Sequence, residues 1–342
     1  MQALQRRLRP RRPGALLALF AALLGACGTP ASPADEAYAA AASDEPPSGV
    51  YALVLGTAQD AGLPQVGCFD DCCRRVRRDP AEARLVTSVL IADERTGKRW
   101  LLDCTPDIEP QVARAQGHPA SRRAPRGVRR PPLFDGVFLT HAHIGHYTGL
   151  LELGPEGYGS RALPVFGSES MQRYLTANDP WAFLVETGAV ELRRLRPGER
   201  VELGEDLTLS AFPVPHRDEL TDTLAFRVDG PARSLLYLPD IDKWERWSER
   251  IEDRIAEVDA ALLDGAFFAD GEIPGRSMAD IPHPFIEESL ARFAALPDAE
   301  RAKVLFTHLN HTNPAADPTS AAAERVRAAG MAIAREGQRI EL

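Results

Sequence analysis

Several short apolar runs in this chain end at a histidine or an aspartate. The run Val137–Thr140 is followed at once by His141-Ala-His-Ile-Gly-His146, and later runs end at His216, Asp240 and His308. Short β-rich apolar runs bounded by turn residues predict buried strands. Functional side chains gather where such strands meet loops. The chain is therefore expected to fold around sheets whose strand ends carry its chemistry.

The expected strands form two groups, with helical segments between and after them. This order fits two packed sheets covered by helices, an α/β fold. The expected strands are Val50–Gly56, Leu85–Ala92, Trp100–Asp103, Leu133–Thr140, Val190–Leu195, Val201–Leu203, Leu207–Val214, Thr223–Val228, Ser234–Leu238, Val258–Leu263 and Lys303–Thr307. The expected helices are Pro106–Ala115, Ile241–Ile255, Pro284–Ala295 and Ser320–Ala329.

Composition and charge argue against a nucleic-acid partner. Of the 342 residues, 44% are hydrophobic and 26% charged, which is ordinary for a globular protein. The net charge is −9, so no excess of Lys and Arg is available to neutralise phosphates. The arginine-rich segment Arg122–Arg130 lacks interleaved aromatic residues, and we interpret it as a solvated loop. Such a loop could also favour an anionic substrate or lie against phospholipid.

The N-terminal segment has the pattern of an export signal. Arginines between Arg6 and Arg12 precede the apolar run Ala15–Leu24. A run of ten residues is too short for a membrane span, which needs roughly 20 residues, but suits a signal peptide. The following Leu24-Gly-Ala-Cys27 resembles a bacterial lipobox, in which the cysteine is lipidated and becomes the mature N-terminus. An ordinary signal peptide with a chance cysteine is the alternative.

This pattern divides the chain into three parts. Residues 1–26 are expected to be a lipoprotein signal peptide, and the Ala/Pro/Ser-rich residues 27–48 a flexible tether. Residues 49–342 are expected to form the folded domain. The protein would then be exported and anchored to a membrane through lipidated Cys27.

The histidines predict a metal site. Three imidazoles between His141 and His146 are costly to bury unless something uses them, and neutral imidazole is a common ligand of zinc and similar metals. At positions i and i+2 of an extended segment, His141 and His143 point the same way, which suits two ligands of one ion. The expected metal ligands are His141, His143, His146, His216, Asp240 and His308.

Residues 50–315 resemble the metallo-β-lactamase superfamily, on Thr140-His-Ala-His-Ile-Gly-His146 and the later His and Asp. The family pattern is HxHxDH, followed by a His, an Asp and a final His. The resemblance implies an αββα four-layer sandwich with one or two zinc ions at one edge. It implies that His141, His143 and His216 bind the first metal and that His146 and His308 serve the second. Asp240 would bridge the two metals.

One position departs from that pattern. The aspartate of HxHxDH, which in the family binds the second metal and helps to orient the attacking water, is Gly145 here. Asp60, just after the first expected strand, is a candidate to replace it, and capping of a turn is the alternative role for Asp60. A site with a single metal, or with iron in place of zinc, is also open.

Two closer resemblances concern shorter segments. Leu55-Gly-Thr-Ala, Gly62-Leu-Pro-Gln65 and His308-Leu-Asn-His-Thr-Asn-Pro314 resemble the pyrroloquinoline quinone biosynthesis protein B group. The expected lipobox is foreign to a cytoplasmic biosynthetic protein, so we expect a relative outside that pathway. In the similar tRNA-processing branch, a strand-end acid and a downstream histidine form a relay near the metals. Asp264 and His283 hold comparable places, which makes His283 a candidate general acid assisted by Asp264, and a histidine packed against Pro284 is the alternative.

The cysteines leave two possibilities open. Cys68, Cys72 and Cys73 are expected in a loop after the first strand, where they could hold a structural zinc or form one disulfide after export. Cys104 is either their fourth partner or a buried free thiol.

The most favoured function is metal-dependent hydrolysis of a small-molecule ester, lactam or phosphodiester. A bound metal lowers the pKa of water toward about 7 and polarises the scissile bond. Two alternatives are a non-haem iron oxygenase related to the quinone-cofactor group and a non-catalytic metal-binding lipoprotein.

Overall fold

The computed structural model describes residues 49–117, 132–273, 275, 277–278 and 281–342. They belong to a unit that runs from Ala42 to Leu342, and the preceding unit Met1–Ala41 lies wholly outside the described residues. The expected signal peptide, tether and lipidated Cys27, and the segment Arg122–Arg130, also lie outside them. Among the helices that are described, none is both long and apolar enough to cross a membrane.

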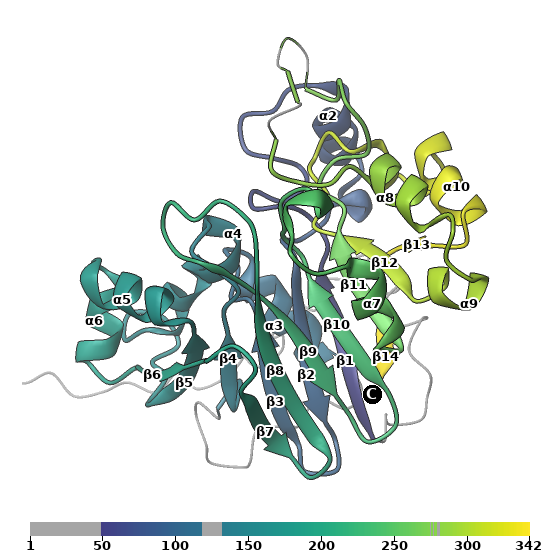
Figure 1. Cartoon of the computed structure of the whole chain (residues 1–342). Helices are drawn as coiled ribbons and strands as arrows, with labels where there is room; N and C mark the ends of the chain where they lie inside the picture. The colour runs from purple at the N-terminus through teal and green to yellow at the C-terminus, as the bar shows by residue number, and fades with distance from the viewer. Residues whose placement is uncertain (1–48, 118–131, 274, 276, 279–280) are drawn as a thin grey trace, which may run out of the picture. The chain divides into compact units, whose positions relative to one another are not determined.

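Two seven-stranded mixed sheets form the centre of the folded unit (Figure 1). The first sheet has the order β14-β1-β2-β3-β4-β5-β6. Its strands are β1 (Val50–Gly56), β2 (Ser88–Asp93), β3 (Lys98–Leu102), β4 (Gly136–Phe138), β5 (Leu163–Gly167), β6 (Val190–Arg194) and β14 (Arg339–Glu341). The second sheet has the order β13-β12-β11-β10-β9-β8-β7. Its strands are β7 (Arg200–Gly204), β8 (Leu207–Val214), β9 (Thr223–Asp229), β10 (Ser234–Leu238), β11 (Ala260–Asp264), β12 (Val304–Thr307) and β13 (Ala332–Ile333).

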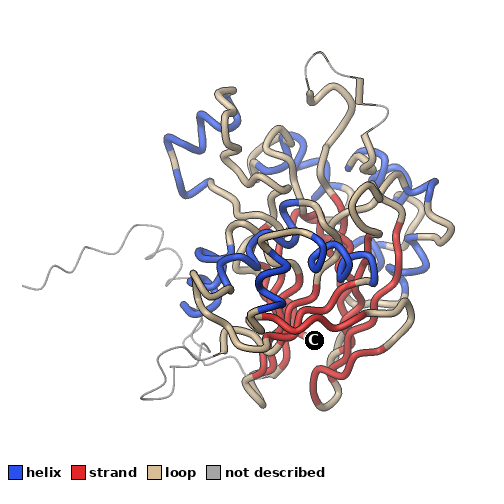
Figure 2. Tube along the Cα trace, turned by 90° about the vertical axis from the view of Figure 1, so that its left-hand side faces the viewer, coloured by secondary structure: helices blue, strands red, loops and turns tan. Residues whose placement is uncertain are grey.

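Helices cover the outer face of each sheet. Figure 2, turned by 90° from Figure 1, shows the strands gathered together with helices around them. The α-helices are α2 (Asp71–Arg78), α3 (Ile108–Gly117), α4 (Ile144–Tyr147), α5 (Glu169–Ala177), α6 (Trp181–Glu186), α7 (Ile251–Ala256), α8 (Ile286–Phe293), α9 (Asp298–Arg301) and α10 (Ala321–Ala328). Short 3-10 helices are η1 (Pro80–Glu82), η2 (Thr148–Leu153), η3 (Trp244–Arg246) and η4 (Pro314–Ala316).

Three apolar clusters show that the layers run helix, sheet, sheet, helix. The middle cluster joins side chains of both sheets, among them Phe138 of β4 and Phe226 of β9, whose rings lie edge to face at 6.1 Å. An outer cluster packs the first sheet against α3, α5 and α6. The other outer cluster packs the second sheet against α7, α8 and α10. Burial of three apolar layers is the main stabilising contribution to such a fold. The expected α/β fold with two packed sheets is confirmed.

The strand directions bring several loops to one edge. β3 to β6 are parallel, and so are β10 to β13. β8 runs in the same direction as β10, because each is antiparallel to β9. The carboxyl ends of strands that point the same way meet at the same edge of a sheet, where ligands bind in open α/β sheets. The segments after β4, β8, β10, β11 and β12 therefore gather there.

The prediction of a helix over Ile241–Ile255 is wrong. In its place lie η3 (Trp244–Arg246) and the short α7 (Ile251–Ala256). The Ile241 N–H donates to Asp264 Oδ2 (3.1 Å) and the Asp242 N–H donates to the Pro215 carbonyl oxygen (2.7 Å). These long-range bonds hold the start of the segment, and the non-helical backbone at Lys243, Trp247 and Arg250 interrupts the expected helix, so tertiary structure overrides the local helical pattern.

Candidate metal centre

Four expected ligands meet at the carboxyl edge of the strands. His141 and His143 follow β4, His216 follows β8, and Asp240 follows β10. Their ligand atoms lie within 4.8 Å of one another and all four residues are buried. His216 Nε2 lies 3.2 Å from Asp240 Oδ1, and His141 Nε2 lies 3.4 Å from Asp240 Oδ2. We call these four residues the first metal group.

A second set of donors adjoins the first. Asp60, His146 and His308 also have ligand atoms within 4.8 Å of one another, and we call them the second metal group. Asp240 lies between the two groups, with its Oδ2 3.6 Å from His146 Nε2 and 3.7 Å from His308 Nε2. The structure thus brings together all six expected ligands and also Asp60.

The donors in these groups fit a cation. Several buried polar atoms here have no hydrogen-bond partner among the described residues, a costly arrangement unless something else satisfies them. These atoms are Asp60 Oδ1, His146 Nε2, His216 Nδ1, Asp240 Oδ1, His308 Nδ1 and His308 Nε2. Imidazole nitrogens with carboxylate oxygens form the ligand set that suits zinc, iron or manganese.

Burial keeps most of the imidazoles neutral. Desolvation, reinforced by neighbouring histidines, lowers the pKa of His141 and His308 well below the ordinary value. It also lowers the pKa of His216, and it lowers that of His143 to about 4, where Arg217 adds to the effect. A metal ligand must be deprotonated, so these rings are ready to bind an ion at neutral pH.

Asp103 holds His146 in place, a role that was not predicted from the sequence. Its Oδ2 accepts a hydrogen bond from His146 Nδ1 (2.9 Å) and one from the Tyr237 hydroxyl (3.0 Å). Its Oδ1 accepts from the Thr140 N–H (2.8 Å). Burial alone would lower the pKa of His146, but the carboxylates of Asp103, Asp60 and Asp264 together raise it, with Asp103 contributing most. Asp103 thereby directs His146 Nε2 toward Asp240. Its position at the end of the expected strand Trp100–Asp103 is the sequence feature that could have indicated a role in the site.

Asp103 and His308 share an uncommon backbone conformation. Both have φ of 61°, in the left-handed region that non-glycine residues rarely adopt. Such residues persist where the surroundings hold them, and they concentrate at functional sites. Here each one turns the chain at the end of a strand, so that its side chain enters the centre.

Asp264 and His283 lie side by side next to the first metal group. His283 Nδ1 donates to Asp264 Oδ2 (2.8 Å) and lies 3.2 Å from Asp240 Oδ1. Asp264 is held in turn by the N–H groups of Ile241 (3.1 Å) and Ala266 (2.9 Å). Burial would lower the pKa of His283, but the carboxylates of Asp264 and Asp240 raise it to about 9. The geometry permits proton donation by His283, and it also permits His283 to act as a further ligand.

The rim of the centre combines charge with apolar side chains. Arg217 Nη2 lies 3.1 Å from His143 Nε2, and the side chain of Arg217 is half exposed. Glu219 flanks it, with Oε1 3.6 Å from Arg217 Nε. Ile144 and Leu220 are 58% and 46% exposed, unusually high values for large apolar residues. A positive charge and two apolar side chains therefore border the centre.

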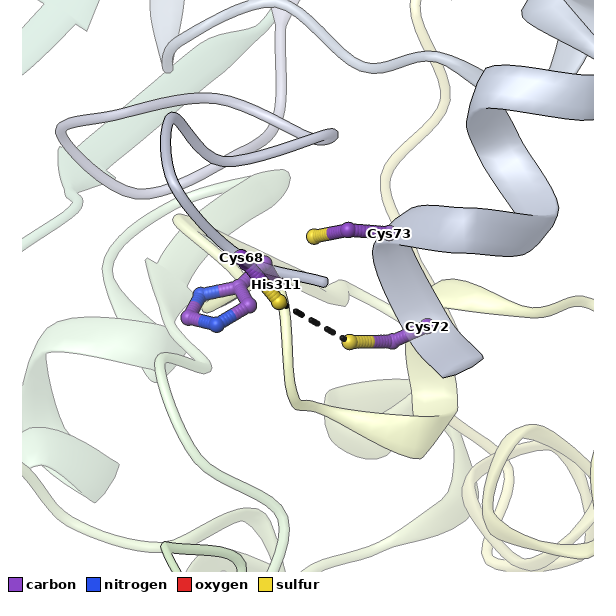
Figure 3. A group of neighbouring side chains, drawn as sticks. All are labelled: Cys68, Cys72, Cys73 and His311. Atoms are coloured by element: carbon purple, nitrogen blue, oxygen red, sulfur yellow. Dashed lines mark hydrogen bonds between the residues drawn. The ribbon is translucent and has the colours of Figure 1, made fainter. Parts of the chain in front are cut away.

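A separate group of donors contains three cysteines (Figure 3). Cys68, Cys72, Cys73 and His311 have ligand atoms within 4.8 Å of one another, and we call them the cysteine group. The Cys68 and Cys72 Sγ atoms lie 3.9 Å apart, and all three thiols are free. Burial raises the pKa of Cys73 to about 12 when no metal is bound. Three thiols and one imidazole form a ligand set typical of structural zinc sites.

One expectation about the cysteines is wrong, and one of the two alternatives for Cys104 is confirmed. Cys72 and Cys73 are not in a loop but on α2, where Asp71 begins the helix and only Cys68 precedes it. Of the two alternatives for Cys104, the structure shows the buried free thiol, which lies in the apolar cluster beneath α3. The fourth member is His311. It was missed because the turn that brings it near follows β12, far away in sequence, and is held to the segment after β1 by the bridge Ala58–Leu309.

The fold and the centre together define a metal-binding protein built as a two-sheet sandwich. The family model for the beta-lactamase superfamily domain matches residues 98–309, which is more than half of the chain. The chain therefore belongs to the metallo-β-lactamase superfamily, and the sequence-based resemblance is confirmed.

Curated relatives and solved structures narrow the relationship. The chain is 29% identical over 313 residues to coenzyme PQQ synthesis protein B of Methylobacterium radiotolerans, covering 85% of this chain and 99% of the relative. It is 28% identical to the protein of the same name from Nitrosococcus oceani, covering 84% of this chain and 99% of the relative. It is thus related to the PQQ synthesis protein B group, as the short segments predicted.

Among solved structures, zinc-bound PqqB from Methylobacterium extorquens has a TM-score of 0.71 at 22% identity, covering 85% of this chain and 100% of the other. A diphosphatase of the PhnP family has a TM-score of 0.58 at 23% identity, covering 85% of this chain and 96% of the other. At these identities the likeness shows the fold alone, and it agrees with the expected metallo-β-lactamase sandwich.

Replacing Asp103 should weaken metal binding without removing a ligand. In Asp103→Asn, His146 loses the carboxylate that orients it, and we expect metal affinity to fall about 10- to 100-fold. Tyr237→Phe is the matched control, because it removes one hydrogen bond to the same carboxylate and leaves His146 held. Zinc titration calorimetry measures both, and equal affinities for wild type and Asp103→Asn would contradict the orienting role.

The cysteine group should bind a metal independently of the histidine centre. Cobalt(II) added to the reduced protein should give a thiolate charge-transfer absorption, which should be lost in Cys73→Ser and kept in Cys104→Ala. Retention of this absorption in Cys73→Ser, or its absence in the wild type, would rule out the metal site. A disulfide detected by mass spectrometry in freshly purified protein would favour the other possibility.

Proposed function

We propose that this chain is a metal-dependent hydrolase. The observation that carries the proposal is the buried first metal group with an Asp264-held imidazole, His283, directly beside it. A cation bound there would supply an activated water at neutral pH and polarise the bond to be cleaved. A protein that only binds metal would not need the buried Asp264–His283 pair beside the first metal group, whereas a hydrolase can use it.

His283 is proposed to donate the proton to the leaving group. Its Nδ1 is held by Asp264 Oδ2 at 2.8 Å, which leaves Nε2 as the donor atom. A pKa raised to about 9 keeps the ring protonated at neutral pH, so that it can act as an acid. Asp264 is a positioning residue, because its contacts are to His283 and to backbone N–H groups.

The substrate is proposed to be anionic, with a phosphoric ester or anhydride as the favoured class. Arg217 brings a half-exposed guanidinium next to His143, and the guanidinium fork matches phosphate or carboxylate oxygens. A structure with the same fold is described as a diphosphatase, which is consistent with this class. The exposed Ile144 and Leu220 would contact an apolar part of the substrate.

Hydrolysis of a small panel of substrates tests the proposal. Full-length protein loaded with zinc or manganese should hydrolyse a phosphodiester such as bis(4-nitrophenyl) phosphate faster than a carboxylic ester or a cephalosporin. Chelation should abolish the activity, and Arg217→Ala should raise KM more than it lowers kcat. No metal-dependent turnover of any member of the panel would contradict a hydrolase.

An oxidative function is the second candidate, because relatives matching along nearly their whole length are named for synthesis of a quinone cofactor. A mixed histidine and carboxylate set also suits iron. Protein purified without added metal would then contain iron and consume oxygen with a reducing substrate. Bound metal with neither turnover nor oxygen consumption would support a metal-binding protein without catalysis.

Substitution of His283 should separate catalysis from metal binding. In His283→Gln we expect unchanged zinc content and a rate lowered about 10²- to 10⁴-fold for a poor leaving group such as methoxide. The loss should be small for 4-nitrophenolate, which leaves without protonation, and this comparison is the internal control. If zinc content falls in this variant, His283 is a ligand rather than an acid.

We also propose that the protein is exported and held at a membrane through lipidated Cys27. The support is the arginine-rich start, the apolar run of ten residues and the lipobox-like Leu24–Cys27. Cys27→Ala should move the protein from the membrane fraction to the soluble fraction and abolish labelling by a fatty-acid analogue, whereas Cys104→Ala should change neither. A labelled, membrane-bound Cys27→Ala protein would contradict the anchor.

A further inference from the structure

Asp60 reaches the metal centre from a segment outside the histidine cluster. It lies after β1, and its Oδ1 is 3.6 Å from His146 Nε2 and has no hydrogen-bond partner in the described part of the chain. His308 Nε2 is likewise without a partner. We infer that Asp60, His146 and His308 bind a second cation beside the first metal group, and that residue 145 is glycine to make room for Asp60.

The contact between Gly145 and Asp60 is too close for any other residue at position 145. A Cβ on Gly145 would clash with Asp60 Oδ1 and would lie 2.7 Å from Asp60 Cα, closer than real Cβ atoms approach. Gly145 lies inside α4 without a positive φ, where glycine is less favourable than alanine. Close approach of Asp60, rather than backbone conformation, therefore explains this glycine.

Two buried atoms without a partner face each other between His146 and Asp60. His146 Nδ1 is engaged with Asp103 Oδ2 (2.9 Å), which leaves Nε2 as the ring atom that can take another partner. His146 Nε2 lies 3.6 Å from Asp60 Oδ1, which is too long for a hydrogen bond. Buried polar atoms without a partner are costly, and a cation bound between these two would remove that cost.

The segment that carries Asp60 is fixed relative to His308. The Leu309 N–H donates to the Thr57 carbonyl oxygen (2.8 Å), and the Gln59 N–H donates to the Leu309 carbonyl oxygen (2.9 Å). Asn310 Nδ2 donates to Gln59 Oε1 (2.5 Å). Asp60 follows Gln59 directly and His308 precedes Leu309, so these bonds set the spacing of two ligands before any ion binds.

Asp240 allows both ions to be held at once. Its Oδ1 faces His216 Nε2 at 3.2 Å, and its Oδ2 lies 3.6 Å from His146 Nε2. One carboxylate can thus serve a cation in each metal group. Nitrogen and oxygen donors in this mixture suit zinc, manganese or iron. The inference rests on the proposed metal centre but does not depend on the substrate.

The test is the number of zinc ions per chain in full-length protein. Asp60→Ala and Asp60→Asn should each hold one zinc fewer than wild type and should retain the ion at the first metal group. His216→Ala should lose the ion of the first metal group and so identifies it. The cobalt–thiolate absorption reports metal binding by the cysteine group separately. Circular dichroism and thermal unfolding establish that each variant is folded.

Gly145→Ala tests the steric part, because residue 145 offers no ligand atom. Without the clash, alanine would favour a helix, so a loss of one zinc in Gly145→Ala reports displacement of Asp60. In the Asp60→Ala background the same change should cause no further loss, a non-additivity expected for residues in contact.

The possible failures are distinguishable. Wild-type zinc content in Asp60→Ala would overturn the inference while leaving the first metal group intact. Loss of all zinc from the histidine centre in Asp60→Ala would also overturn it, because Asp60 would then belong to a single site. Unchanged zinc content in His216→Ala would instead remove the proposed metal centre itself.

Discussion

The buried carboxylate of Asp240 is the constraint on which the centre depends. Burial raises its pKa well above the ordinary value, and the nearby acids Asp264 and Asp60 raise it further. The imidazolium of His283 and the guanidinium of Arg217 lower the pKa of Asp240, but burial and the two acids outweigh them. An ionised carboxylate in such a place is unfavourable unless it is paired or coordinates a metal. The fold therefore holds Asp240 in a geometry that a cation stabilises.

Two further carboxylates hold the imidazoles on either side of Asp240. Asp103 binds the Nδ1 of His146, and Asp264 binds the Nδ1 of His283. Each carboxylate is itself held by backbone N–H groups, and each ends a strand of a different sheet or follows it directly. A ring held at one nitrogen presents the other in a fixed direction, which is how outer carboxylates tune metal sites. Each sheet thus contributes one carboxylate that holds an imidazole of the centre.

Much of the fold and of the metal centre could be predicted, because a buried strand is recognisable from its local sequence pattern. Apolar runs located the central strands, and their carboxyl ends gave the expected ligands His141, His216 and His308. The sequence could not show contacts between distant segments. His311 comes near the cysteines because the segment around Leu309 pairs with the segment around Ala58. The helix expected over Ile241–Ile255 is interrupted by non-helical backbone at Lys243, Trp247 and Arg250, and its start is bonded to Asp264 and Pro215. A local sequence pattern predicts individual strands and helices. Contacts between distant segments determine where these predictions fail.

Gly145 shows why a missing motif residue does not establish a missing site. The pattern HxHxDH places a carboxylate one residue before His146, and its absence there suggests a centre with fewer ligands. In the folded chain the space beside Gly145 is filled by the Asp60 side chain, which follows β1, whereas Gly145 follows β4 of the same sheet. A metal responds to the position of an oxygen atom and not to the segment that supplies it. Glycine at position 145 and aspartate at position 60 are therefore one structural feature, and neither can be interpreted alone.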